Sequence, residues 1–219
     1  MNALAELLGE KGHLVLDGAM GTQLFEAGLV AGDAPESWNL DRPDDITAIH
    51  RAYVAAGSDV ILTNSFGGTR FRLQLHRLDD RVREVNAAAA RNARVAADEA
   101  DRRVLVAGSM GPTGELMIPL GRLTPEEVED GFAEQAEGLA EGGADILWLE
   151  TLSALEALEA GVRGARKATD LPVVATMSYD TAGRTMMGVT GSAQGEMIAA
   201  GTPVKVIGHR GSDLLVIEA

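Results

Sequence analysis

Val15–Leu16–Asp17–Gly18–Ala19–Met20–Gly21–Thr22 decides the fold, because a short apolar run ends there in a small polar signature. Four further runs repeat this arrangement, at residues 60–66, 104–112, 146–151 and 173–180. Helical patterns separate the runs, and strands that alternate with helices indicate βαβ units around a parallel sheet. We therefore expect the polar signatures to collect at one edge of one sheet and to form the active site there.

The predicted helices carry their own start and stop signals. Thr124–Pro125–Glu126–Glu127 combines an N-cap, a proline at the first helical position and a glutamate that can close a capping box. Ser153 and Glu156 repeat this box further along the chain. Asp44–Asp45 begins another helix, which Gly57 ends just before the second strand. The order strand, loop, helix therefore holds along the chain.

The composition limits the class of protein. The chain has 219 residues, 46% of them hydrophobic, so it can bury a sizeable core. Its apolar runs have the length of strands and its first residues form an amphipathic lead-in, so we expect no signal peptide, no membrane span and a cytoplasmic location. A net charge of −14 disfavours binding to nucleic acids and anionic membranes, and a solvated acidic surface explains it without any partner.

Several kinds of chemistry are excluded by residue type. Cysteine is absent, which removes disulfides, thiolate nucleophiles and cysteine-bound zinc. The four histidines show no pair at metal-ligand spacing, and we expect all of them at the surface: His13, His50, His76 and His209. No lysine follows a predicted strand directly, which disfavours Schiff-base and pyridoxal chemistry. Carboxylate, amide and hydroxyl groups remain at the strand ends.

Asp17 and Glu150 are the strongest candidates for a functional site. Each follows at least three apolar residues and precedes a loop, where a carboxylate is unfavourable unless it meets a cation or backbone donors. Together they could hold an ammonium group. Residue type alone equally allows Asp17 to cap its own loop and Glu150 to cap the following helix. The amide of Asn64 and the hydroxyls at the strand ends more often cap loops than bind ligands.

Four of the signatures, in this order and spacing, resemble the homocysteine-binding barrel of the homocysteine S-methyltransferase family. These are Leu16–Thr22, Thr63–Phe66, Gly108–Pro112 and Leu149–Thr151. The resemblance covers about residues 12–190 and implies an α/β fold of the (β/α)8 TIM-barrel type. It also implies that Asp17 and Glu150 hold the amino group of homocysteine. By the same resemblance Ala19 and Met20 line the amino-acid pocket, and Asn64 belongs to the substrate site.

The resemblance also implies a reaction and its needs. Members of the family move a methyl group from an onium or cobalt-bound donor to the thiolate of homocysteine, which gives methionine. Zinc stabilises that thiolate, and in the family cysteines after the sixth and eighth strands hold the metal. This sequence contains none of those cysteines. We therefore expect homocysteine and a methyl donor as ligands, no zinc in this chain, no activity of the chain alone, and we assign no catalytic residue.

The C-terminal part departs from the barrel pattern. Too few residues follow Asp180 for three further strand–helix units, which need on the order of 90 residues. We therefore predict an incomplete barrel of about five β/α units over residues 1–190 and a separate β-rich tail over 191–219. Within the tail, residues 201–207 and 214–217 predict an antiparallel hairpin, and the segment weakly resembles the end of an NfeD-type OB-like domain. The open edge of the fifth strand predicts self-association.

Two classes of function stay open at this point. The first is an S-methyltransferase-type protein with an amino-acid pocket but without its zinc site. The second is a non-catalytic binding or scaffold fragment that uses the half-barrel. A metal-free lyase with Asp17 and Glu150 as acid and base is disfavoured, because no histidine or lysine follows a predicted strand directly.

Overall fold

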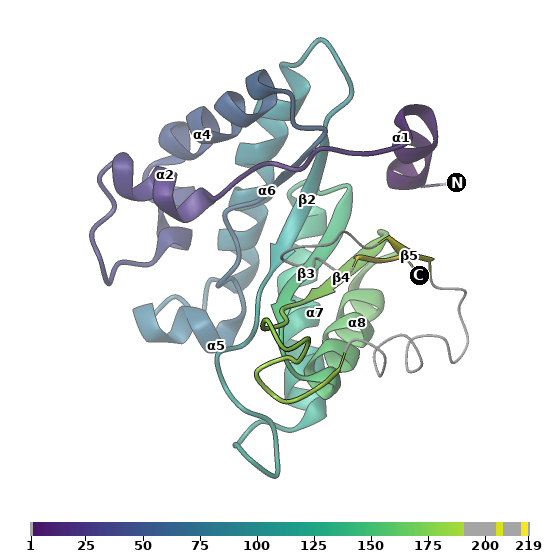
Figure 1. Ribbon diagram of the computed structural model, residues 1–219. Helices are drawn as coiled ribbons and strands as arrows, with labels where there is room; N and C mark the ends of the chain where they lie inside the picture. The colour runs from purple at the N-terminus through teal and green to yellow at the C-terminus, as the bar shows by residue number, and fades with distance from the viewer. Residues whose placement is uncertain (1, 191–204, 208–215, 219) are drawn as a thin grey trace.

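The structure is a computed structural model that describes residues 2–190, 205–207 and 216–218 (Figure 1). The helices are α1 (Ala3–Lys11), α2 (Met20–Glu26), α3 (Trp38–Asp41), α4 (Pro43–Ala56), α5 (Arg70–Leu73), α6 (Val82–Asp98), α7 (Pro125–Glu141) and α8 (Leu155–Ala168), with 3-10 turns η1 (Pro35–Ser37) and η2 (Gln74–His76). The strands are β1 (Val60–Leu62), β2 (Leu105–Met110), β3 (Ile146–Leu152), β4 (Val173–Met177), β5 (Lys205–Ile207) and β6 (Val216–Glu218).

One sheet holds these strands in the order β1-β2-β3-β4-β6-β5. The pairs β1–β2, β2–β3 and β3–β4 are parallel. Helix α6 connects the first pair, α7 the second and α8 the third, so each crossover is a βαβ unit (Figure 1). The predicted α/β architecture with a parallel sheet is confirmed.

The first predicted strand is much shorter than expected. Leu16 forms an isolated parallel bridge to Val60, and the Asp17 amide donates to the Val60 carbonyl over 3.0 Å. The segment therefore lies beside β1, as the βαβ pattern requires, but it makes no regular strand. The chain leaves the sheet after Asp17, and both Asp17 and Gly18 line a cavity.

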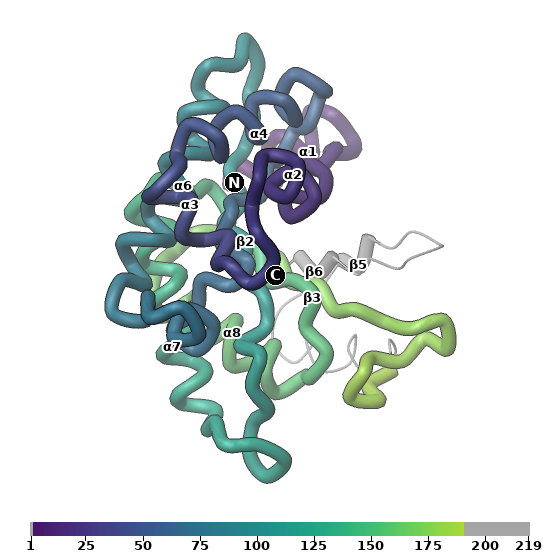
Figure 2. The backbone as a smooth tube through the Cα atoms, turned by 90° about the vertical axis from the view of Figure 1, so that its left-hand side faces the viewer, coloured from purple at the N-terminus to yellow at the C-terminus, as the bar shows by residue number. Residues whose placement is uncertain are grey.

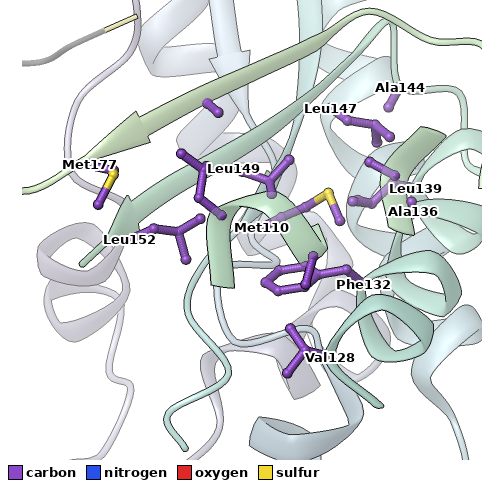
Figure 3. Packing of buried hydrophobic residues seen from close by; sticks show 14 of the residues in the cluster. Met110, Val128, Phe132, Ala136, Leu139, Ala144, Leu147, Leu149, Leu152 and Met177 are labelled. Carbon is purple, nitrogen blue, oxygen red and sulfur yellow. The ribbon is translucent and has the colours of Figure 1, made fainter. Parts of the chain in front are cut away.

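The face of the sheet that carries the helices holds the main core. Side chains alternate along a strand, so every second residue of the parallel strands points toward α6, α7 and α8. In β3 these are Leu147 and Leu149, which pack in one buried cluster with Phe132 of α7. Figure 3 shows Phe132 beside Met110 and Val128 in this cluster. All of these side chains are excluded from solvent, so this face supplies most of the hydrophobic stabilisation.

The opposite face of the sheet has an apolar half and a polar half. Toward the amino ends of the strands, Leu105, Ile146 and Val174 form a second buried cluster, and Leu7 of α1 packs against it. Toward the carboxyl ends the same face presents Ser109 and Glu150 instead. Figure 2 shows the outer helices α3, α6 and α7 on one side of the strands, while the segment after β4 extends away from them. The inner face is thus packed against α1 at the amino ends of the strands and lines a cavity at their carboxyl ends.

The two predicted capping boxes have different outcomes. At α7 the box is complete, because Thr124 Oγ1 accepts from the Glu127 amide and a Glu127 carboxylate oxygen accepts from the Thr124 amide. The second box is wrong: α8 has Ala154 as its N-cap and no side chain caps it. Strand β3 runs through a bulge as far as Leu152, and this moves the start of the helix past the position that Ser153 would need.

The C-terminal strands contradict the prediction of a free sheet edge. Strands β5 and β6 pair antiparallel, as predicted, and β6 also pairs antiparallel with β4, which places Ile217 opposite Ala175. Antiparallel pairing satisfies backbone groups of β4 that a parallel neighbour would otherwise occupy. The predicted edge is therefore covered at this position. The rest of the predicted hairpin, 201–204 and 208–215, lies outside the described residues, and self-association stays a prediction.

Candidate functional site

A cavity of about 710 Å³ lies at the carboxyl ends of the parallel strands. All five residues that the sequence assigned to the substrate site line it: Asp17, Ala19, Met20, Asn64 and Glu150. The carboxyl ends of parallel strands are where α/β folds of this type place their binding groups, because the connecting loops meet there. The predicted residues are thus brought together, while their binding roles stay a prediction.

The Asp17 carboxylate accepts a hydrogen bond from the neighbouring strand, β1, and not from its own loop. One carboxylate oxygen accepts a hydrogen bond from the Leu62 amide over 2.9 Å. Burial is the main reason that the pKa of Asp17 rises to about 7, and the negative charge of Glu150 raises it further. The alternative in which Asp17 accepts from the following glycine amides is not what the structure shows. A carboxyl group with this pKa is divided between its neutral and ionised forms near neutral pH.

Glu150 projects from the end of β3 into the same cavity. Its Oε1 accepts from the Ser109 hydroxyl over 2.5 Å, and burial raises its pKa above the usual value. Glu150 does not cap α8, whose N-cap is Ala154. The next residue, Thr151, has a φ of 63°, in the left-handed region that non-glycine residues seldom adopt. This strained residue coincides with the bulge in β3, so the backbone is bent directly after the candidate binding carboxylate.

Ala19 and Met20 lie where the first loop enters α2. The Ala19 carbonyl accepts from the Tyr53 hydroxyl over 2.9 Å, which ties this loop to α4. A Cβ atom at Gly18 would lie 2.9 Å from that same hydroxyl oxygen, so a larger residue there would displace the tyrosine. Ala19 is also the N-cap of α2, and no side chain caps that helix. Both Ala19 and Met20 line the cavity.

Asn64 forms hydrogen bonds that connect the loops around the cavity. Its side-chain amide donates to the Pro35 carbonyl over 2.8 Å, and its own carbonyl accepts from the Asn39 amide group over 2.7 Å. The side chain is buried with these partners. Its structural role is therefore to join the loop after β1 to η1 and α3.

A buried polar network supports the site from the helix side. The Gln135 side-chain amide donates to the Ser65 carbonyl over 2.8 Å and to the Ser109 carbonyl over 3.2 Å. Asn86 donates to the Gly68 carbonyl over 2.8 Å. These bonds fix the loops after β1 and β2 to α6 and α7, and the Gln135 Oε1 atom is buried without a hydrogen-bond partner among the described residues. The positions of Ser109 and, through it, Glu150 depend on this network.

Other polar residues that the sequence did not assign to a site also line the cavity, and Glu36, Arg72 and His76 are three of them. Glu36 of η1 is buried and accepts from the Gly67 amide over 2.7 Å. Arg72 of α5 and His76 of η2 also line it. None of the three follows a strand, so the strand-end signal that led to Asp17 and Glu150 does not apply to them.

His50 corrects the expectation that every histidine lies at the surface. Its side chain is completely buried in α4, and neither ring nitrogen has a partner among the described residues. Burial lowers its pKa to about 4, so the ring is neutral near pH 7. The spacing could have shown this, because His50 follows the buried Ile46 by four residues and therefore lies on the same face of the helix. His13 and His76 are exposed as predicted, and His209 lies outside the described residues.

Comparison with known proteins identifies the family. A family model for homocysteine S-methyltransferases matches residues 14–209. The chain belongs to the homocysteine S-methyltransferase family. The match runs past residue 190, into the segment that the sequence analysis assigned to a separate tail, so that boundary stays a prediction.

The related proteins are much longer than this chain. Methionine synthase of Mycobacterium tuberculosis is 37% identical over 209 residues, which cover 89% of this chain and 17% of that protein. Methionine synthase of Mycobacterium leprae is 36% identical over 217 residues, which cover 93% of this chain and 18% of that protein. The chain thus spans less than a fifth of these relatives.

The solved structures of the homocysteine methyltransferase MmuM from Escherichia coli have the same fold. The oxidized form has a TM-score of 0.78 and 25% identity, with 91% of this chain and 74% of that chain covered. The metallated form has a TM-score of 0.77 and 24% identity, with 90% of this chain and 74% of that chain covered. The TIM-barrel type of this chain is therefore confirmed, and it corresponds to about three quarters of the MmuM chain.

The described part of the chain does not fit a metal centre. Within residues 2–190, 205–207 and 216–218 no three histidine or acidic side chains lie close enough together to hold an ion. Cysteine, the ligand that the family resemblance implies, is missing from the whole sequence. The same described residues include no helix that is both long enough and apolar enough to cross a membrane. The expectations of no zinc and of a cytoplasmic location stay predictions.

Proposed function

We propose that the cavity binds homocysteine, with its ammonium group between Asp17 and Glu150, as the acceptor side of a methyl transfer that gives methionine. One observation carries this proposal: the two carboxyl groups line the same cavity, and no cation among the described residues forms an ion pair with either. An ammonium ligand is the group that would match them, because it donates three hydrogen bonds and carries the opposite charge.

The raised pKa values couple binding to pH. Asp17, with a pKa of about 7, must be ionised to attract an ammonium group strongly. A bound ammonium ion favours the ionised carboxylate, so binding releases a proton from the fraction of molecules in which Asp17 is neutral. Affinity for the ligand should therefore increase from pH 6 to pH 8. The Leu62 amide and the Ser109 hydroxyl keep both carboxylates in position for this contact.

Activation of the thiol is a separate requirement. Zinc would supply it by stabilising the thiolate, but the side chains of this chain do not fit a zinc site of the family type. We therefore propose that this chain alone binds the amino acid and does not transfer the methyl group. Metal analysis of the purified chain should find less than stoichiometric zinc, and methionine formation should not exceed an enzyme-free control. Turnover that a chelator abolishes would contradict this part of the proposal.

The binding part is tested with methionine, which carries the same amino-acid group. The full chain is titrated by NMR at pH 7.5 beside Asp17→Asn, Glu150→Gln and a control, Asp79→Asn, which removes an exposed carboxylate outside the cavity. We expect millimolar affinity for the wild type and the control, and at least a fivefold loss in the other two, the scale of an ion pair of about 1 kcal/mol. Equal binding by all four proteins would reject the ammonium site and favour a scaffold function.

A further inference from the structure

Tyr53 of α4 contacts the loop that follows Asp17. Its hydroxyl donates to the Ala19 carbonyl over 2.9 Å. Burial raises the pKa of this hydroxyl, and the negative charges of Asp17 and Glu26 raise it further, so the phenol lies within reach of the Asp17 charge. Tyr53 is not one of the residues that line the cavity. It can therefore influence a ligand there only through the loop.

The loop leaves room for the tyrosine at Gly18. A Cβ atom at Gly18 would lie 2.9 Å from the Tyr53 hydroxyl oxygen and 3.0 Å from the ring carbon Cε1. Gly18 is not among the glycines with a positive φ, so its backbone conformation does not require glycine. The close approach of Tyr53 gives the reason for a residue without a side chain. Gly18 and Tyr53 thus fit together, one between Asp17 and α2 and the other on α4.

The loop is fixed at both of its ends. Toward the sheet, the Asp17 amide donates to the Val60 carbonyl over 3.0 Å and the Leu62 amide donates to the Asp17 carboxylate over 2.9 Å. Toward the helices, the hydrogen bond from Tyr53 fixes Ala19, the N-cap of α2, which has no side-chain cap. The Tyr53 ring packs against two buried clusters, one around α2 and α4 and one between α6 and the strands β1 and β2. Loss of the hydroxyl alone would leave the loop fixed at one end.

We propose that Tyr53 is a positioning residue of the amino-acid site, whose hydroxyl holds the loop after Asp17 in the shape that receives the ligand. This inference rests on the proposed function, in which Asp17 and Glu150 hold the ammonium group. Tyr53 makes no contact with the ligand and takes no part in a reaction. Because the loop is already ordered before the ligand arrives, binding does not include the free-energy cost of ordering it.

The two tyrosines of the chain allow a matched test. Tyr53→Phe removes the hydroxyl and keeps the ring, and the control Tyr179→Phe removes a buried hydroxyl that has no partner among the described residues and lies outside the cavity. Methionine is titrated by NMR at pH 7.5 into the full chain and both variants. We expect Tyr53→Phe to bind about threefold to tenfold more weakly, the scale of one lost hydrogen bond. Tyr179→Phe should bind like the wild type.

A second measurement needs no ligand. The Leu62 amide donates to the Asp17 carboxylate, so its hydrogen exchange reports whether that carboxylate stays in place. We expect exchange at least about threefold faster in Tyr53→Phe, because the loop then opens more often, and no change in Tyr179→Phe. Gly18→Ala should act in the same direction, since it displaces the same hydroxyl, and it should cost less when it is added to Tyr53→Phe.

Three outcomes would overturn the inference. The first is equal methionine binding by the wild type and Tyr53→Phe, and the second is an unchanged exchange rate of the Leu62 amide. The third is an equal loss of affinity in Tyr179→Phe, because the effect would then not depend on the loop. Failure of the proposed function looks different: Asp17→Asn would bind methionine as well as the wild type, or the wild type would not bind it. The Leu62 amide would still test whether Tyr53 holds Asp17 in place.

Discussion

The two faces of the parallel sheet differ in what covers them. The outer face is covered by α6, α7 and α8, and its side chains form two buried clusters, a large one that includes Phe132 and a smaller one that includes Ile61 and Val106. The inner face is sealed by α1 over its apolar half only and opens into the cavity over its polar half. Consecutive residues of one strand, such as Leu149 and Glu150, therefore lie on opposite faces of the sheet, the first in the core and the second at the cavity. The outer face holds the main core, and the residues proposed to bind the ligand lie on the inner face.

Phe132→Ala should show the largest effect, because it removes the largest side chain from the outer core. Phe132 is completely buried between α7 and the sheet. Truncation of a buried phenylalanine typically lowers the free energy of unfolding by about 3 to 5 kcal/mol through lost burial and the cavity left behind. Denaturation with urea measures this, and Phe132→Leu, which keeps most of the volume, should lose much less. A loss below about 1 kcal/mol would mean that the outer face does not carry the stability.

Gly164→Ala should have the second largest effect. Gly164 lies in α8, and an added Cβ would come within 2.3 Å of the Glu129 carbonyl oxygen of α7. The clash should separate the two helices and lower the free energy of unfolding by about 1 to 3 kcal/mol.

Gly9→Ala is the matched control for this change. Gly9 also lies in a helix, α1, but nothing lies within 4 Å of its added Cβ. Alanine is the better helix former, so this variant should gain about 0.5 to 1 kcal/mol. Stabilisation of both variants would show that α7 and α8 do not pack as closely as the structure has them.

The sequence predicts the parallel sheet and the strand-end site because both depend on local patterns. Apolar runs that end in polar residues place Asp17 and Glu150 at the carboxyl ends of strands, whatever the packing elsewhere. Glu36 and Arg72 are different, since they reach the cavity from short helical segments whose positions depend on long-range packing. No periodicity in the sequence marks such residues.

Competing local signals explain the other errors. Ser153 and Glu156 have the spacing of a capping box, but the bulge that prolongs β3 decides where α8 begins. The free sheet edge was predicted from parallel strands alone, and β6 covers it from a distant part of the sequence. In each case a contact remote in sequence overrides a correct local rule.

Asp17→Asn should have a smaller effect on stability than Phe132→Ala and Gly164→Ala, and of the opposite sign. The pKa of Asp17 is raised from 3.8 to about 7 in the folded chain, mainly by burial. A group with a raised pKa stabilises the fold fully below its unfolded pKa, and this stabilisation is lost as the pH rises through the folded pKa. The wild type is therefore penalised at pH 8, where Asp17 is ionised, and the neutral asparagine is not. Water in the open cavity screens the charge, so we expect a gain of about 1 kcal/mol.

The pH dependence separates this effect from a general change in packing. At pH 4 the difference between Asp17→Asn and the wild type should be close to zero, and it should grow between pH 4 and pH 8. Asparagine keeps an oxygen that can accept from the Leu62 amide, so the hydrogen bond of 2.9 Å does not obscure the comparison. Asp79→Asn, at an exposed site, should show no such trend. If Asp17→Asn lost stability at pH 8, the inner face would rely on this carboxylate for folding, and stability and binding would not be divided between the two faces.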